Sequence, residues 1–146
     1  MAKHDLIDEL VDGCLMSRAR RLARVVTAIY EDELRDFDIK PSQLNLLVAV
    51  AKAGPVRRID IGRATDIDPS TLTRNLSVML ANGWIKEGVE GDDGRGNPIC
   101  ITPKGRSLIQ RVGPSWRKAQ QRTRKLLGDY RAGVLLGMFD ASSGMN

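Results

Sequence analysis

The side chains best suited to chemistry in this sequence lie between positions 68 and 83, in the segment DPSTLTRNLSVMLANG. If the segment forms a helix with about 100° per residue, one stripe holds its large apolar residues, Leu72, Leu76, Met79 and Leu80. The opposite side then carries one arginine and otherwise small or hydroxylated residues, namely Ser70, Thr71, Arg74, Ser77, Val78 and Ala81, with Thr73 and Asn75 on its flanks. A solvated helix face usually carries several Lys and Glu, whereas short polar groups and a guanidinium suit a helix that enters the major groove of DNA.

Within this face, Arg74 is the predicted reader of guanine, because a guanidinium can donate two hydrogen bonds to the guanine O6 and N7 atoms. Ser70 and the other short polar residues are expected to contact the major groove and the adjacent phosphates, and hydroxyl groups more often position a protein on phosphates. The helix itself is well specified, with an N-cap at Asp68, a first-turn proline at Pro69 and a stop at Gly83.

A second polar cluster follows this helix in a turn-rich stretch. Residues 84–89 and 99–101 have the composition of strands, and the glycine-rich residues 91–97 between them predict a β-hairpin. Arg95, the cation at the hairpin tip, is expected to enter the minor groove, where a narrow A·T tract concentrates negative potential. Asp93 either orients Arg95 or only shapes the turn. Phosphate contacts are predicted for three further cations, Arg58, Lys86 and Lys104.

No constellation for catalysis or metal binding is visible in the sequence. His4 is its single histidine, which removes most imidazole acid–base chemistry and most zinc sites. There is no glycine-rich phosphate-binding loop, and the hairpin turn explains the adjacent acids Asp92 and Asp93. We therefore expect no enzyme activity, no metal and no other cofactor.

Charge and cysteine content favour a cytoplasmic protein with a polyanionic partner. The 146 residues carry a net charge of +5, and residues 103–131 hold nine basic side chains against one acid. A basic balance suits a nucleic acid, and a solvated basic helix is the alternative interpretation. No stretch resembles a membrane span or a signal peptide, and two cysteines, Cys14 and Cys100, are too few for a disulfide framework.

The sequence before position 68 predicts three helices. One long amphipathic helix is expected over 5–35, and a helix that is apolar almost all round is expected over 41–54. A short helix is predicted over 59–65. Its inward-facing residues are predicted to be Ile59, Ile61 and Ala64.

After the hairpin, Thr102 and Pro103 form an N-cap and a first-turn proline that begin another helix. Gly128 should end it, and a short helix is expected from about 130 to 139. The predicted fold is therefore mainly α-helical with a small β-hairpin.

This order of elements is that of a winged helix-turn-helix, and the sequence resembles the MarR-type transcriptional regulators over residues 41–106. The resemblance is strongest in 68–83, which looks like the family's recognition helix, and in the wing segment DGRGNPICITPKGR at 93–106. The wing pattern of the family is Asp, one residue, Arg, five residues, an aliphatic residue and Thr, followed by Pro-Lys-Gly. The matching residues here are Asp93, Arg95, Ile101, Thr102, Pro103, Lys104 and Gly105.

The resemblance implies a winged helix-turn-helix DNA-binding lobe at 41–106, an N-terminal dimerisation helix at 1–40 and C-terminal dimerisation helices at 107–146. The implied assembly is a homodimer on double-stranded DNA. Its two recognition helices would enter successive major grooves of a pseudo-palindromic operator, ~34 Å apart. The apolar faces of the helices that flank the lobe independently favour dimerisation.

The resemblance also implies a transcription regulator, most often a repressor, that a small phenolic or aromatic effector or cysteine oxidation releases from DNA. Cys14 lies roughly where hydroperoxide-sensing relatives carry their reactive thiol, and Arg18 one turn on would supply a cationic neighbour. The alternative for Cys14 is a small apolar core residue. The alternative for the whole chain is a winged-helix module that binds protein or RNA.

Overall fold

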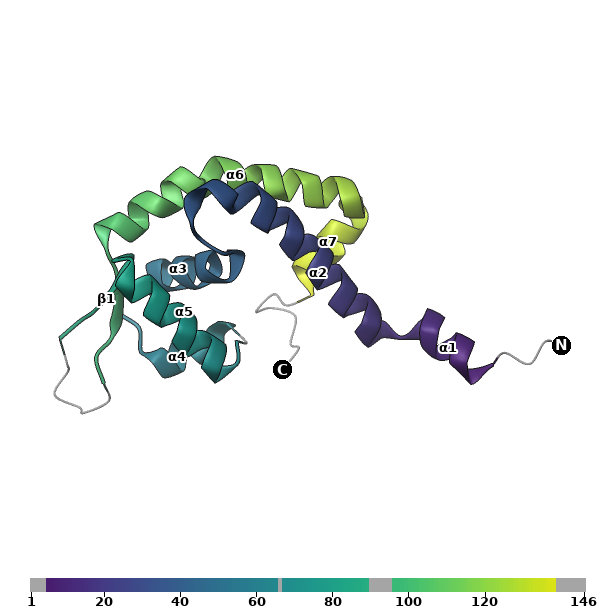
Figure 1. The fold of residues 1–146 in the computed structure, drawn as a ribbon, viewed down its shortest axis with the longest axis horizontal. Coiled ribbons are helices and arrows are strands. Elements are labelled where there is room, and N and C mark those ends of the chain that lie inside the picture. Colours follow the sequence, from purple (N-terminus) through teal and green to yellow (C-terminus); the bar gives the residue numbers. More distant parts are fainter. Residues whose placement is uncertain (1–4, 66, 90–95, 139–146) are drawn as a thin grey trace. The chain divides into compact units, whose positions relative to one another are not determined.

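The computed structural model describes residues 5–65, 67–89 and 96–138, which form helices and one small hairpin (Figure 1). The elements in chain order are α1 (Leu6–Gly13), α2 (Leu15–Leu34), the 3₁₀ helix η1 (Arg35–Phe37), α3 (Pro41–Ala53), α4 (Arg58–Thr65), α5 (Pro69–Ala81), β1 (Ile85–Glu87), β2 (Ile99–Ile101), α6 (Pro103–Leu127) and α7 (Asp129–Gly137). The prediction of a mainly α-helical fold with a small hairpin is confirmed. No helix in the described ranges is long and apolar enough to cross a membrane.

The N-terminal region forms two helices where the sequence predicted one. α1 begins after its N-cap Asp5, whose Oδ1 accepts a hydrogen bond from the N–H of Ile7 at 3.3 Å. It ends at Gly13, and Cys14 has an extended backbone with φ −75° and ψ 106°. Glycine has a low helix propensity, so the helix stops there although the apolar pattern continues. The prediction of one helix over 5–35 is therefore wrong.

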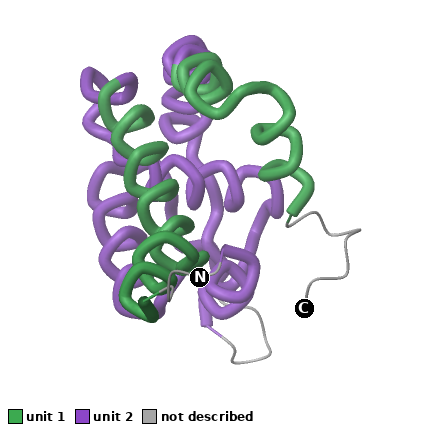
Figure 2. Tube along the Cα trace, turned by 90° about the vertical axis from the view of Figure 1, so that its right-hand side faces the viewer, with its two compact units in different colours: residues 1–32, 119–146 green, residues 33–118 purple. Residues whose placement is uncertain are grey.

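Residues 33–118 form a compact unit with its own core (Figure 2). Its apolar side chains come from the end of α2, from α3, α4, α5 and the hairpin, and from the first part of α6. The largest fully buried members are Leu34, Leu46, Leu47, Val50, Leu76, Met79, Ile85, Ile99 and Val112. α3 supplies three of these side chains, Leu46, Leu47 and Val50, because the helix is apolar almost all round, as its sequence predicts.

The predicted stripe of α5 faces this core. Leu72, Leu76 and Met79 are buried, and Leu80 is half-buried. Since α5 is anchored along one side, the burial of these side chains decides which residues of the helix point away from the lobe.

α4 packs through fewer residues than its sequence predicts. Ile61 is buried, whereas Ile59 is 60% exposed and Ala64 is exposed. The prediction that all three residues face inward is thus wrong for Ile59 and Ala64. An eight-residue helix makes about two turns, so it brings few positions against a neighbour.

The hairpin pairs β1 and β2 antiparallel, with Ile85 opposite Ile101 and Lys86 opposite Cys100. Val56, just before α4, extends the pairing through two backbone hydrogen bonds with Ile99, of 3.0 and 2.7 Å. The base of the hairpin is therefore joined both to the helix-turn-helix and to α6.

Close packing at the start of α6 holds the end of α5 beside the hairpin. Thr102 Oγ1 lies 2.6 Å from the carbonyl oxygen of Gly83 and accepts a hydrogen bond from the N–H of Gly105 at 3.0 Å. A Cβ on Gly105 would overlap the carbonyl oxygen of Trp84 and lie 2.9 Å from Cγ1 of Ile101. Only glycine fits at this contact, which gives the Pro-Lys-Gly sequence a packing reason.

Residues 1–32 and 119–146 form the second compact unit (Figure 2). Within it, Arg122 and Asp32 form an ion pair with 2.6 Å between Nη1 and Oδ2. Gly128, with φ of +80°, separates α6 from α7 as its position predicts. The functional boundaries at residues 40 and 106 stay predictions, and the compact units divide the chain after 32 and after 118.

Candidate nucleic-acid interface

The N-terminus of α5 is fixed by the side chain of Asp68. Its Oδ1 accepts hydrogen bonds from the N–H of Thr71 at 3.0 Å and from the Oγ of Ser70 at 2.6 Å. Hydrogen bonds from Ser70 first and Thr71 second hold the pKa of the Asp68 carboxyl well below its usual range. The carboxylate is therefore ionised at neutral pH and caps the helix with its negative charge near the positive end of the helix dipole.

The outward face of α5 is exposed and carries one charged side chain. Thr73, Arg74 and Ser77 are exposed, and Thr71 is half-buried. Nη2 of Arg74 donates to Oγ1 of Thr71 at 3.3 Å, so one turn of the helix supports the guanidinium. The segment from Pro69 to Ala81 contains no acid that would neutralise it.

Asn75 lies at the edge between this face and the core stripe. The residue is half-buried, and its Nδ2 atom is fully buried with no hydrogen-bond partner in the described part of the chain. A buried amide without a partner is uncommon and costly. Asn75 is thus less accessible than Arg74, one position before it.

The predicted cations around α5 come from three different elements. Lys86 is exposed on β1, and Lys104 is exposed in the first turn of α6. Arg58 is the first residue of α4, and its Nη2 lies 2.9 Å from Oε1 of Glu87 at the end of β1. Asp93 and Arg95, together with the single histidine His4, lie outside the described residues.

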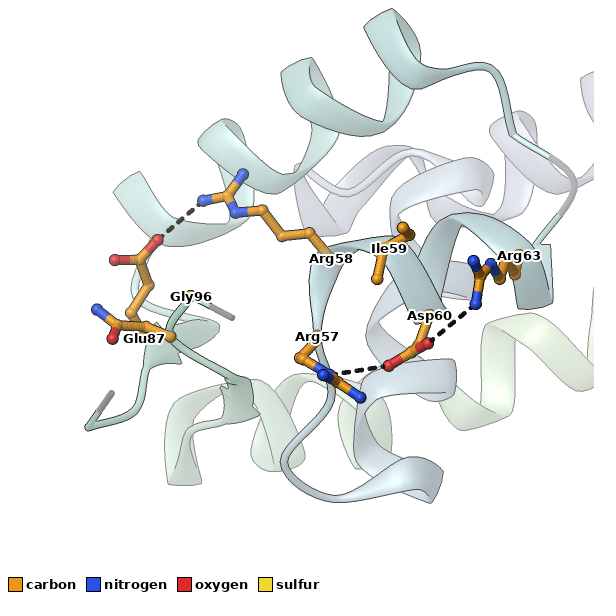
Figure 3. A pocket seen from close by; sticks show the side chains of 8 residues that line it. Arg57, Arg58, Ile59, Asp60, Arg63, Glu87 and Gly96 are labelled. Carbon is orange, nitrogen blue, oxygen red and sulfur yellow. Dashed lines mark hydrogen bonds and ion pairs between the residues drawn. The ribbon is translucent and has the colours of Figure 1, made fainter. Parts of the chain in front are cut away.

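Arg58 lines a cavity of about 600 Å³ between the start of α4 and the base of the hairpin (Figure 3). Two other arginines line it, Arg57 and Arg63, and both point toward Asp60. Nε of Arg57 lies 3.3 Å from Oδ2 of Asp60, and Nη1 of Arg63 lies 3.9 Å from Oδ1. Three guanidinium groups therefore face two carboxylates, those of Asp60 and Glu87, which leaves a positive balance for an anion such as a phosphate.

The sequence-based prediction included Arg58 but missed Arg57 and Arg63. The available signal was the Arg57-Arg58 pair directly before a helix, with Arg63 further along the same helix. The tertiary fold adds what this signal lacked, because Glu87 comes from a strand 29 positions away.

A second cavity, of about 700 Å³, lies within the same compact unit and has an apolar character. Its lining comes from α3, from α4 and the residues that follow it, and from α6: Ser42, Leu44, Asn45, Val48, Ala49, Ala64, Thr65, Ile67, Ile109, Val112, Gly113 and Trp116. These residues include hydroxyls, one amide and one indole, but no charged side chain. Its size and lining are those of a site for a small organic molecule.

Cys14 occupies the break between α1 and α2 and is half-exposed. Hydrogen bonds from Ser17, through its side chain first and its backbone second, lower the pKa of the Cys14 thiol below its ordinary value. Arg18, the predicted cationic neighbour, donates from Nη2 to the carbonyl oxygen of Asp12 at 3.3 Å. Cys100 is half-buried in β2.

A helix with an exposed polar face, preceded by a short helix and followed by a hairpin, defines a winged helix-turn-helix protein. Comparison with known proteins agrees. The model of the MarR family matches residues 37–96. The multiple antibiotic resistance protein MarR of Salmonella typhimurium is 28% identical over 98 residues, which cover 66% of this chain and 68% of that protein.

Solved structures show the same fold. A mutant MarR from Escherichia coli in complex with operator DNA matches with a TM-score of 0.79 and 20% identity, over 90% of this chain and 94% of that one. BpsR of Bordetella bronchiseptica, whose DNA binding is regulated by 6-hydroxynicotinic acid, matches with a TM-score of 0.73 and 22% identity. The match covers 84% of this chain and 89% of that one. Residues 37–96 thus match the MarR family of transcription regulators, and the fold of the chain is that of solved MarR structures.

Proposed function

We propose that this chain is a homodimeric, sequence-specific repressor that acts in the cytoplasm and binds a pseudo-palindromic operator through α5. The observation that carries the proposal is the exposed face of α5, with Arg74 and short hydroxyl side chains on the side opposite its buried stripe. The E. coli relative bound to operator DNA supports the choice of ligand. Repression is the mode of action that the family resemblance implies.

The proposed major-groove contacts are Ser70, Thr71, Thr73, Arg74, Asn75 and Ser77. The hairpin is proposed to place Arg95 in the minor groove, with Asp93 as its support. Phosphates on either side are assigned to Lys86, Lys104 and Arg58, and the arginine-lined cavity adds Arg57 and Arg63 to this group.

Homodimerisation is proposed through the helices outside the lobe. No residue of α1 is buried, and Leu6, Ile7, Leu10 and Val11 are each 61–66% exposed. α7 likewise exposes Leu136, at 61%. Apolar surface of this extent on adjacent turns is typical of an interface between subunits. These helices belong to the regions predicted for dimerisation, 1–40 and 107–146.

Release from DNA is proposed to follow binding of a small aromatic effector in the apolar cavity beside Trp116. The volume suits such a molecule, and the indole offers a stacking surface. Among the described residues of the lining, the polar groups are Ser42, Asn45, Thr65 and the indole of Trp116, and none is charged. An uncharged polar group such as a phenol hydroxyl suits this lining. The regulation of BpsR by 6-hydroxynicotinic acid supports a small aromatic effector.

Oxidation of Cys14 is a second proposed route to release. A half-exposed thiol with a lowered pKa is the form of cysteine that reacts with peroxide. Peroxide treatment should then weaken DNA binding by the wild type, and Cys14→Ser should prevent that loss. Unchanged binding by protein whose Cys14 is shown by mass spectrometry to be oxidised would contradict this route.

Selection of bound sequences from random duplex DNA tests the main proposal. A two-fold symmetric consensus whose binding weakens steeply with salt is expected, since each phosphate contact releases counterions. A module that binds protein or RNA would select no such consensus.

A further inference from the structure

Three hydroxyl groups on the outward face of α5 already donate their protons within the protein. Oγ of Ser70 lies 2.6 Å from the Asp68 carboxylate, Oγ1 of Thr73 lies 2.9 Å from the carbonyl oxygen of Pro69, and Oγ of Ser77 lies 2.9 Å from that of Thr73. Neither a carbonyl nor an ionised carboxylate has a proton to give. Each hydroxyl must therefore be the donor, and its free lone pairs make it an acceptor toward any outside ligand.

This polarity decides what the face can bind. Phosphate oxygens only accept hydrogen bonds, so an acceptor hydroxyl cannot bind them without first losing its internal bond. In the major groove, the exocyclic amino groups at adenine N6 and cytosine N4 are donors. The hydroxyls of α5 are thus set for bases rather than for phosphates, which differs from the usual role of Ser and Thr.

We propose that Ser70, with its proton held by Asp68, accepts a hydrogen bond from an adenine or cytosine amino group and so determines part of the operator sequence. The proposal rests on the proposed function and deepens it. Arg74 has the opposite polarity and reads the acceptor atoms of guanine. The two side chains therefore select different bases from one helix face.

Among the three hydroxyls, Ser70 has the most firmly held proton. Its bond to Asp68 is short and charge-assisted, whereas Thr73 and Ser77 donate to neutral carbonyls. Asp68 is itself held by the N–H of Thr71. A carboxylate this close also repels a phosphate and attracts an amino group, so charge and hydrogen-bond polarity favour the same ligand. Asp68 is accordingly a positioning residue for Ser70.

The test uses the selected operator with one base at a time replaced by an analogue that lacks the amino group, purine for adenine or 2-pyrimidinone for cytosine. At the position that Ser70 reads, the wild type should lose about three- to tenfold in affinity, the value of one hydrogen bond. At that position, Ser70→Ala should bind the natural operator and the analogue-containing operator with equal affinity. Ser107→Ala, the control at an exposed serine of α6 outside the proposed contacts, should keep the wild-type difference in affinity between the two duplexes.

Asp68→Gly tests the positioning role separately. Glycine is well tolerated at the N-cap, so circular dichroism should show the helix intact. The substitution removes the oxygen that accepts from both Ser70 and Thr71, so the Ser70 hydroxyl proton becomes free and this variant should be less sensitive to the amino group than the wild type. If Ser70→Ala loses as much affinity as the wild type when the amino group is removed at every position, the inference about Ser70 is wrong, and the proposed DNA-binding function stands. If the wild type binds no duplex, both the inference and the proposed function are wrong.

Discussion

The two compact units of this chain bury their apolar side chains to very different extents. In residues 33–118, Leu46, Leu47, Val50, Leu76 and Met79 are fully buried. In the described residues of the other unit, α1 buries nothing, and the buried side chains are small ones such as Ala119 and Ala132. The winged lobe therefore has a core that one chain completes, whereas the helices outside it offer apolar surface that one chain leaves open.

This contrast separates two sources of stability. A side chain in the lobe contributes through burial within its own chain, so its removal should lower the stability of the lobe directly. A side chain of α1 should contribute through a partner chain, so its effect should depend on protein concentration.

Gly105→Ala should destabilise the lobe by about 3 kcal/mol, because the added methyl group overlaps the carbonyl oxygen of Trp84 and the core cannot yield without backbone movement. Gly133→Ala in α7 is the matched control. Apart from the backbone of α7 itself, no described atom lies within 4 Å of a Cβ at Gly133, and alanine in a helix is more stable than glycine by up to about 1 kcal/mol. Urea unfolding followed by circular dichroism should show a lower free energy of unfolding for Gly105→Ala and a higher one for Gly133→Ala. Equal free energies for the two variants would contradict the close contact described at Gly105.

Leu10→Ala should weaken the homodimer at least tenfold while the lobe stays folded. Leu10 is 61% exposed in the single chain, and burial of such a side chain in an interface contributes about 1.5–3 kcal/mol. Sedimentation equilibrium measures the dimer dissociation constant, and the fluorescence of Trp84 and Trp116, both in the lobe, reports on its folding. Ser17→Ala, on the neighbouring helix, is the control. Sedimentation of the wild-type chain as a monomer would contradict the proposed dimer interface.

Arg74→Ala should weaken binding to the selected operator by about 1–3 kcal/mol and relax the preference at one guanine. Arg131→Ala, which removes an exposed arginine from the other unit, should change affinity far less. Titration of labelled duplexes at fixed salt gives both values. Equal losses for the two variants would mean that charge alone, rather than base contact, accounts for the effect.

Glu87→Gln should strengthen DNA binding by less than tenfold and make its salt dependence slightly steeper. Glu87 pairs with Arg58 across a half-exposed contact, and exposed pairs contribute little to stability. Removing the carboxylate leaves Arg58 to bind phosphate and to release one more counterion. Asp129→Asn, which breaks the exposed Arg124–Asp129 pair in the other unit, should leave affinity unchanged. Weaker binding by Glu87→Gln would show instead that Glu87 holds Arg58 in its binding position.

Much of the lobe could be predicted from the sequence because its signals are local. The cap at Asp68, the first-turn proline at Pro69 and the spacing of Leu72 and Leu76 each act within a turn or two of helix. The break at Gly13 was missed because periodicity outweighed a single glycine, although glycine weakens any helix.

The candidate interface was predictable to a lesser degree. Arg74 and the hydroxyls of α5 follow from the helical face alone, and the amphipathic stripe already assigns them outward. Arg57 and Arg63 were missed, since nothing local distinguishes a solvated arginine from one that lines a cavity. The pairing of Arg58 with Glu87 depends on where β1 returns to α4.

Apart from the break at Gly13, the order of the helices, the limits of α5 and the side of α5 that faces outward all follow from local sequence patterns. These features depend on residues a few positions apart, whose backbone propensities and side-chain spacing act before any tertiary contact forms. In contrast, three features depend on how the chain folds in space: the close contact at Gly105 that excludes a Cβ, the pairing of Glu87 with Arg58, and the exposure of Ile59. These features depend on which residues far apart in the sequence come into contact, and local sequence patterns do not specify such contacts.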